Sequence, residues 1–119
     1  MIIKVKNKDT LIYDEFIFQC CVGKNGFSKN KVEGDKKTPI GNFSLGNLYY
    51  RNDRKIKPIS KLKIFKIKKN MGWCNDIKSK FYNKPIMRKK SLKHEKMFRH
   101  DRKYDLVIIL DYNFKNAIL

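Results

Sequence analysis

The chain has 119 residues, enough for one domain with a hydrophobic core, and its 41% hydrophobic and 13% aromatic content excludes a disordered chain. The formal net charge of +18 points to anionic partners, but lysine outnumbers arginine 24 to 5. Dedicated phosphate-binding proteins use more arginine, because the planar guanidinium matches phosphate geometry. We therefore interpret most lysines as surface filler and do not expect nucleic acid as a partner.

Export, membrane-spanning and metal-binding patterns are not visible in the sequence. Residues 1–16 lack an apolar segment long enough for a signal peptide, and no run of residues could span a bilayer. The three cysteines, Cys20, Cys21 and Cys74, have neither the spacing of a disulfide framework nor that of a zinc site. We expect no metal and no cofactor.

The first half of the chain predicts short strands. β-Branched residues cluster at Ile2–Val5 and Thr10–Tyr13 with a turn between them, which predicts an opening hairpin. The next predicted strand is Phe16–Val22, and its apolar composition predicts that it is mostly buried. The strand pattern resumes at Asn42–Tyr50.

The second half predicts more strands and one helix. Leu62–Ile67 is a short predicted strand, residues 71–76 form a predicted loop with the only tryptophan, and Phe81–Ile86 continues it irregularly. Ser91–Phe98 is the one helix candidate, because a serine N-cap precedes apolar residues at helical spacing. Tyr104–Asp111 is the most apolar strand and suits a central sheet position. The sequence thus predicts one mainly β domain, residues 1–119, with one short helix.

The segment Lys31–Phe43 (KVEGDKKTPIGNF) is unusually rich in turn-forming residues. Gly34-Asp35 predicts a turn, because glycine allows positive φ and aspartate binds its own backbone. Pro39 fixes its own φ and favours an extended residue before it. From these residues alone, the segment is either a shaped functional loop or a plain surface connection.

The candidate chemical groups do not form a complete catalytic set. Cys74 could be a nucleophile, but a reactive thiolate needs a nearby base, and the sequence does not bring His94 or His100 to it. We favour a small buried residue beside an aromatic one. A second set of polar residues is closely spaced and fits either a site network or surface ion pairs. These residues are Glu95, Arg99, Asp101, Tyr104 and Asp105.

Three motifs in order resemble a known family. They are KVEGDKKTPIGNFSLGNLYYRNDR, then GWCND followed by KFYN, then HEKMFRHDRKYDLVIILDYN. From about Val22 to Asn113 the chain looks like the first two-thirds of an L,D-transpeptidase catalytic domain of the YkuD type. The resemblance implies a β-sandwich and an enzyme that acts on peptidoglycan stem peptides. In that family a cysteine thiolate attacks the peptide, forms a thioester and passes the acyl group to an amine.

The resemblance assigns loop and substrate-cleft residues but no catalytic residue. The family's histidine and its S/T-x-G-C nucleophile motif correspond to positions after Leu119, so we assign no catalytic residue and expect residues 1–119 to be inactive alone. A strand as apolar as Val107–Leu110 needs neighbours on both sides, so we expect the fold to be incomplete at the C-terminus. The loop residues Gly34, Pro39 and Gly41 match the family pattern. The substrate-cleft candidates are Asp35, Thr38, Arg51, Trp73, Asp76, Tyr82, Asn83, Glu95, Arg99 and Asp101.

The resemblance also implies a monomer in the periplasm or cell envelope, with peptidoglycan stem peptides as partners. The alternative is a basic non-enzymatic module that binds nucleic acid or an anionic wall polymer, for which a steep salt dependence of binding is diagnostic.

Overall fold

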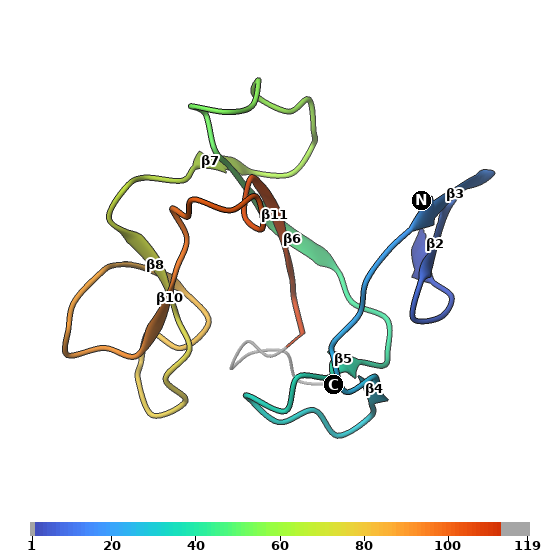
Figure 1. Cartoon of the computed structure of the whole chain (residues 1–119), viewed down its shortest axis with the longest axis horizontal. Coiled ribbons are helices and arrows are strands. Elements are labelled where there is room, and N and C mark those ends of the chain that lie inside the picture. The colour runs from blue at the N-terminus through green and yellow to red at the C-terminus, as the bar shows by residue number, and fades with distance from the viewer. Residues whose placement is uncertain (1, 113–119) are drawn as a thin grey trace. The chain divides into compact units, whose positions relative to one another are not determined.

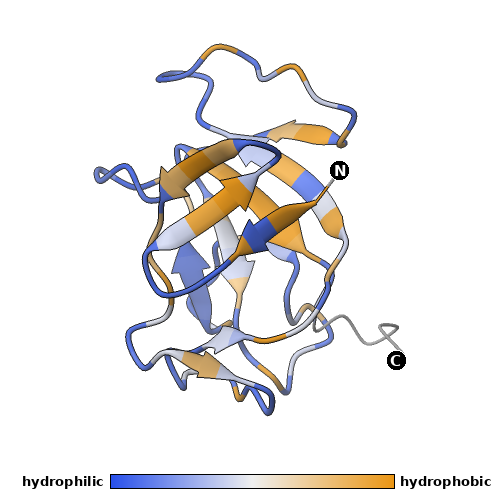
Figure 2. Ribbon diagram, turned by 90° about the vertical axis from the view of Figure 1, so that its right-hand side faces the viewer, coloured by the Kyte–Doolittle hydropathy of each residue, from blue (hydrophilic) through white to orange (hydrophobic). Residues whose placement is uncertain are grey.

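The computed structural model describes residues 2–112, which contain eleven strands and no helix (Figure 1). Contacts divide the chain into two compact units, residues 1–42 and residues 43–119. Figure 2 shows hydrophobic residues gathered in the strands and hydrophilic residues in most of the connecting loops. The predicted mainly β class is confirmed, and no helix among residues 2–112 is long and apolar enough to cross a membrane. The single domain remains a prediction.

The first unit begins with the predicted hairpin, extended by a third strand. The antiparallel sheet has the order β1-β2-β3, formed by β1 (Ile3–Val5), β2 (Thr10–Tyr13) and β3 (Phe16–Gln19). The first turn is closed by the Asp9 N–H, which donates to Asn7 Oδ1 at 3.1 Å. Local turn chemistry and β-branched residues thus give the structure that they predict.

The predicted burial of β3 is wrong. The strand ends at Gln19 rather than Val22, and the side chains of Phe16, Ile17 and Phe18 are all exposed. The physical reason is that β3 is an edge strand of a three-stranded sheet, and among residues 2–112 it pairs only with β2. Apolar composition predicts strand propensity, but it does not show whether another layer covers the strand.

The remaining strands of the first unit are very short. β4 (Phe27–Ser28) and β5 (Thr38–Pro39) pair in parallel, and Thr38 aligns with Phe27. The long connection between them contains most of the segment Lys31–Phe43. This segment therefore leads into β5, as a loop followed by a strand.

The second unit contains two three-stranded sheets. The first sheet has the order β11-β6-β7, with β6 (Leu45–Tyr50), β7 (Ile64–Lys66) and β11 (Leu106–Leu110). The second has the order β10-β8-β9, with β8 (Met71–Cys74), β9 (Pro85–Met87) and β10 (His94–Lys96). β6 pairs in parallel with β7, and the other pairs are antiparallel.

A shared core joins these two sheets. Tyr49, Ile67 and Met97 are buried together, and partly buried side chains from both sheets pack against them. The Tyr49 ring stacks on Phe65 with centroids 5.3 Å apart and meets Trp73 edge-on at 6.2 Å. Such aromatic pairs add to the free energy of burial, so β6 and β8 are held together through Tyr49.

The helix predicted at Ser91–Phe98 is wrong, because His94–Lys96 form β10 and pair with β8. An eight-residue helix gains little stability from its own hydrogen bonds, whereas a strand here completes a ladder with β8. The loop predicted at residues 71–76 and the irregular stretch predicted through Ile86 are also wrong in part, since β8 and β9 occupy them.

Gly72 explains why a strand was not expected there. A Cβ at this position would lie 2.8 Å from His94 Cδ2 and 3.2 Å from Arg88 Cγ. The glycine therefore allows these two side chains to cover the strand closely, which is a recognised use of glycine within sheets.

The central position predicted for the most apolar strand is not seen among residues 2–112. β11 is an edge strand, and among the described residues it pairs only with β6, which is the central strand (Figure 1). Its side chains alternate between partly buried Val107 and Ile109 and exposed Leu106, Ile108 and Leu110. Residues 113–119, where the predicted continuation would begin, lie outside the described residues.

We predict that Ile67→Ala lowers the free energy of unfolding by about 3 kcal/mol, because it removes a buried side chain from the shared core. The measurement is urea denaturation followed by tryptophan fluorescence. Ile59→Ala is the matched control: Ile59 is fully exposed, so the change should stay within about 0.5 kcal/mol. Equal effects of the two substitutions would contradict this core assignment.

Candidate functional site

The centre of the candidate site is the buried guanidinium of Arg51, at the end of β6. Its side chain is only 3% exposed, and Nε and Nη2 each donate to Asp53 at 2.8 Å. Nη1 donates to the Arg99 carbonyl at 2.7 Å, and the guanidinium carbon lies 3.5 Å from the centroid of the Phe98 ring. The hydrogen bonds to Asp53 raise the pKa of Arg51, and the Arg51 guanidinium lowers the pKa of Asp53.

The turn after β6 places a second arginine beside the first. The Arg54 and Lys55 N–H groups both donate to the Arg51 carbonyl, which forms the charged turn that the sequence predicts. Arg54 Nη1 then donates to Asp105 Oδ1 at 2.9 Å and to the Asp101 carbonyl at 2.8 Å. Asp105 is buried, so this ion pair neutralises a carboxylate that has little access to water.

A third arginine pairs within its own turn. Arg99 Nε and Nη2 hold Asp101, the shortest bond being 2.6 Å, and the Lys103 N–H also donates to that carboxylate. The Arg99 hydrogen bond, followed by the Lys103 N–H, lowers the pKa of Asp101 to about 2. We call Arg51, Arg54 and Arg99, with Asp53, Asp101 and Asp105, the arginine cluster.

Tyr104 connects the arginine cluster to the second sheet. Its hydroxyl donates to Glu95 Oε2 at 2.6 Å, and its ring lies under the Arg99 guanidinium at 5.8 Å. Burial and, after it, the hydrogen bond to Glu95 raise the pKa of Tyr104 to about 12. Glu95 is the cross-strand partner of Trp73, whose indole meets Tyr49 in the core.

Five of the ten predicted cleft residues therefore belong to one connected group. They are Arg51, Trp73, Glu95, Arg99 and Asp101. They come from three segments that are distant in sequence, so the structure brings together most of the motif residues of the second unit. Arg51 and Arg99 bond within the group, and Asp53, Lys103 and Tyr104 bond to it from outside.

Three other candidates shape the loop between β8 and β9. Asp76 Oδ1 accepts from the Lys78 N–H at 3.0 Å, and the Tyr82 N–H donates to the Ser79 carbonyl. Asn83 has a positive φ of 57°, and its N–H donates to the Cys74 carbonyl at 2.9 Å. Asparagine tolerates this left-handed conformation better than most residues, which accounts for its place in the loop.

The remaining two candidates, Asp35 and Thr38, organise the segment Lys31–Phe43 in the first unit. Asp35 accepts from the Val32 N–H, the Lys37 N–H and Lys31 Nζ at 2.8, 2.8 and 2.6 Å. The bond from Lys31, followed by that from the Val32 N–H, lowers the pKa of Asp35 to about 2. The carboxylate thus closes the turn that the sequence predicts at this position.

Thr38 holds the other end of the same segment. Its Oγ1 accepts from the Gly23 N–H at 2.7 Å, and its own N–H donates to the Gly26 carbonyl at 2.8 Å. A Cβ on Gly23 would lie 2.5 Å from the Lys36 carbonyl oxygen, so only glycine fits there. Asp35 and Thr38 both use their side chains to build the loop.

The structure brings Cys74 and His94 together, which sequence spacing did not reveal. They are directly opposite each other in β8 and β10. Cys74 is 0% exposed, however, and the imidazole is already engaged. His94 Nδ1 is 2.6 Å from the Leu92 carbonyl, and Arg88 Nε donates to Nε2 at 3.4 Å. The thiol has no exposed surface, so the predicted burial of Cys74 is confirmed, and its packing role stays a prediction.

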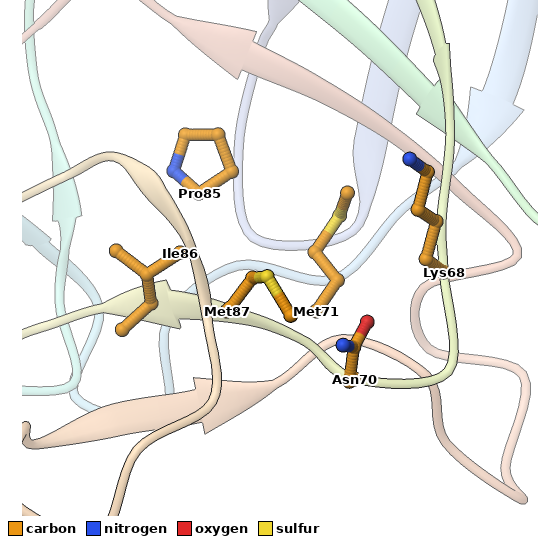
Figure 3. Close-up of a pocket in the computed structure, with 6 residues that line it drawn as sticks. All are labelled: Lys68, Asn70, Met71, Pro85, Ile86 and Met87. Atoms are coloured by element: carbon orange, nitrogen blue, oxygen red, sulfur yellow. The ribbon is translucent and has the colours of Figure 1, made fainter.

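A pocket of about 400 Å³ lies at the β8–β9 hairpin (Figure 3), and its lining residue Pro85 is directly opposite the candidate Trp73. Figure 3 shows Lys68 and Asn70 on one side of it and Pro85 and Ile86 on the other, with two methionines between them. The lining residues are Lys68, Asn70, Met71, Pro85, Ile86 and Met87. None was a predicted site residue. The sequence signal that could have indicated this pocket is the group of apolar residues within an otherwise lysine-rich stretch.

Lysines and arginines occupy different environments. All lysines of residues 2–112 except Lys31 are exposed, while Arg51, Arg54 and Arg99 pair with carboxylates. Residues 2–112 contain no group of three or more His, Cys, Asp or Glu side chains that could hold a metal ion. The positive charge is therefore spread over exposed, flexible side chains.

Comparison of the chain with protein-family models, with curated proteins and with solved structures finds no match.

We predict that Arg51→Lys lowers the free energy of unfolding by about 2 kcal/mol, because lysine cannot reproduce the paired bonds to Asp53 together with the bond to the Arg99 carbonyl. Chemical denaturation measures the change. Arg102→Lys is the control, since Arg102 is exposed and should tolerate the substitution. An Arg51→Lys variant with an unchanged free energy of unfolding would show that the guanidinium geometry does not stabilise the fold.

We predict that one of the six tyrosines ionises near pH 12 and that Tyr104→Phe removes this transition. The folded protein holds this pKa above the ordinary value of 10.0, so the stabilisation is complete below pH 10 and is lost as the pH rises toward about 12. Ultraviolet absorbance of tyrosinate follows the ionisation, and thermal melting follows the stability. An unchanged high-pH transition in Tyr104→Phe would refute the assignment.

Proposed function

We propose that the chain is an L,D-transpeptidase-type protein that binds peptidoglycan stem peptides, and that residues 2–112 provide its frame without a nucleophile. The observation that carries this proposal is the convergence of Arg51, Trp73, Glu95 and Arg99 in one group. These residues come from the parts of the matching stretches that lie in the second unit, and they are distant in sequence but close in space. The finer β-sandwich fold of that family is part of the same proposal.

The proposed reaction class is acyl transfer through a cysteine thioester. A thiolate attacks the carbonyl of an L-to-D peptide bond and releases the terminal D-residue, and an amine then takes the acyl group from the thioester. The geometry of Cys74 supports excluding this residue from that role, because its thiol is buried and both nitrogens of His94 already have partners. We therefore assign residues 2–112 a binding and framing role.

The alternative, a basic module for an anionic polymer, has one observation in its favour. Exposed lysines surround the chain and give it most of its +18 charge. The arginines that would form paired contacts with phosphates are instead engaged with carboxylates in the arginine cluster. This use of arginine favours the interpretation of the lysines as solubilising charge.

We predict that residues 1–119 release no D-amino acid and form no crosslink when incubated with muropeptides, as followed by mass spectrometry. Cys74→Ser should behave like the parent chain, and Cys21→Ser serves as a control because that thiol is exposed. Turnover by the parent chain that disappears in Cys74→Ser would mean that Cys74 is the nucleophile and that the proposed role is wrong.

We predict that the chain co-sediments with peptidoglycan sacculi and that prior removal of the stem peptides abolishes this binding. The triple substitution Lys89→Gln, Lys90→Gln and Lys93→Gln removes three exposed charges and should leave stem-peptide binding unchanged. Binding that survives removal of the stem peptides and falls steeply between about 0.05 and about 0.2 M salt would instead favour the anionic-polymer module.

A further inference from the structure

The connection between β6 and β7 combines lysines with apolar residues. Residues 55–63 read KIKPISKLK, and no acidic residue occurs in the sequence between Asp53 and Asp76. Pro58 lacks an N–H group and favours an extended residue before it, which opposes a helix in this stretch. Residues 56–60 accordingly belong to no helix, strand or turn. We call residues 55–63 the β6–β7 loop.

Two isoleucines of the β6–β7 loop are almost fully exposed to water. Ile56 is 93% and Ile59 105% exposed, the highest values among the large hydrophobic residues of residues 2–112. Pro58 and Leu62 of the same loop are partly buried. An isoleucine left in water loses the free energy that its burial would provide. Solubility does not explain these two side chains, which are available to an apolar environment outside the second unit.

Both ends of the β6–β7 loop are fixed to the second unit. The Lys55 N–H donates to the Arg51 carbonyl at 2.8 Å, and the Leu48 N–H donates to the Lys63 carbonyl at 2.9 Å. Between these ends, residues 56–59 make no hydrogen bond or ion pair with any described residue. Figure 1 shows the loop, in green, extending beyond β7. Its tip can therefore contact another surface while the strands at its base stay folded.

The lysines of the β6–β7 loop carry charge that no carboxylate neutralises. Lys55, Lys57 and Lys61 are exposed, and none of them forms an ion pair within the part of the chain that the structure describes. In Figure 2 the loop, at the top, carries both hydrophobic and hydrophilic residues. Exposed isoleucines thus lie beside unpaired cations, a combination that fits a partner with an apolar interior and an anionic surface.

We propose that the β6–β7 loop docks the protein on the surface of an anionic lipid membrane. Ile56 and Ile59 enter the boundary between lipid headgroups and acyl chains. Lys55, Lys57 and Lys61 keep their ammonium groups at the level of the lipid phosphates, while their aliphatic stems lie along the apolar boundary. Apolar burial and charge act together here, just as a single acyl chain needs a basic patch beside it for stable membrane attachment.

The lack of fixed geometry at the loop tip favours a fluid partner over a folded one. A protein partner binds its apolar anchors in shaped pockets, which requires side chains in defined positions. The tip, residues 56–59, has no hydrogen bond that would hold it in one arrangement. A bilayer surface accepts apolar side chains in many arrangements. A nucleic acid or wall polymer would bind the lysines and leave both isoleucines in water.

Flotation of the full chain with large vesicles tests the proposal. Vesicles of phosphatidylglycerol and phosphatidylcholine in equal parts should carry the chain to the top of the gradient in about 0.1 M salt, and vesicles of phosphatidylcholine alone should not. No flotation with the anionic vesicles, or equal flotation with both kinds, would overturn the proposal. This readout involves no stem peptide, so it is independent of the function proposed above.

Substitution of the exposed isoleucines tests the apolar contribution. Ile56→Ser and Ile59→Ser should each weaken binding to the anionic vesicles about tenfold, because each removes a side chain that enters the membrane. Both positions lie outside the core, so thermal melting should be unchanged. Ile77→Ser is the matched control, since Ile77 is 63% exposed in the connection between β8 and β9. Equal losses at all three positions, or unchanged binding without Ile56 and Ile59, would overturn the proposal.

Substitution of the loop lysines tests the charge contribution separately. Replacing the three unpaired lysines by glutamine should weaken binding to the anionic vesicles at least about tenfold, because each lysine near an anionic surface adds to the affinity. The variant is Lys55→Gln, Lys57→Gln and Lys61→Gln. The control with the same change in net charge is Lys89→Gln, Lys90→Gln and Lys93→Gln, which should retain most of the binding. Equal losses in both variants would overturn the proposal, because net charge alone would then account for binding.

Tryptophan fluorescence tests insertion of the loop directly. Ile59→Trp keeps a large apolar side chain, and its emission should shift to shorter wavelength with anionic vesicles and be quenched by brominated lipid. Ile77→Trp should show neither change. Trp73 is present in both variants, so the difference between them comes from the introduced indole. Flotation of Ile59→Trp without a shift or quenching would overturn the proposal.

Discussion

The desolvated cation of Arg51 is the interaction on which the second unit most depends. A guanidinium with almost no access to water is unfavourable unless each of its three nitrogens has an N–H group with a partner. Asp53 accepts two of them and the Arg99 carbonyl accepts a third, while Phe98 covers the planar face. These partners come from two segments 48 residues apart, so the end of β6 and the connection after β10 are fixed in place together.

This polar arrangement and the hydrophobic core stabilise each other. The connection that supplies the Arg99 carbonyl follows directly after Met97, which is buried against Tyr49 and Ile67. A displacement of this connection would therefore expose apolar surface and leave charged groups unpaired at the same time. Tyr104 extends the coupling to β10 through its bond to Glu95. Few residues thus hold the two sheets of residues 43–112 in a single arrangement.

The sequence predicted those features that depend on neighbouring residues. The strands at Ile3–Val5 and Thr10–Tyr13 follow from β-branched residues and turn chemistry, and the Asp35 turn follows from a Gly-Asp pair. The strand at His94–Lys96 was missed, because its pairing with β8 depends on residues some twenty positions away. A serine N-cap is a local helix signal, and here the non-local ladder outweighs it.

The candidate site also divides into features that local sequence predicts and features that depend on distant residues. Sequence motifs selected Arg51, Trp73, Glu95 and Arg99, and the structure connects them, but their burial and their mutual bonds could not be derived from spacing. The opposition of Cys74 and His94 was likewise invisible, because it requires the register of β8 against β10. The pocket at β8–β9 depends on the same hairpin, which the sequence did not predict.

The burial of Cys74 has a practical consequence for following the motions of this protein. Cys21 is exposed and Cys20 is partly so, and both lie in the first unit, while Cys74 is enclosed in the second. A thiol reagent would thus label the first two at rates set by simple accessibility. It would reach the third only when the sheet around β8 opens. The rate of labelling at Cys74 therefore reports how often the second unit unfolds locally.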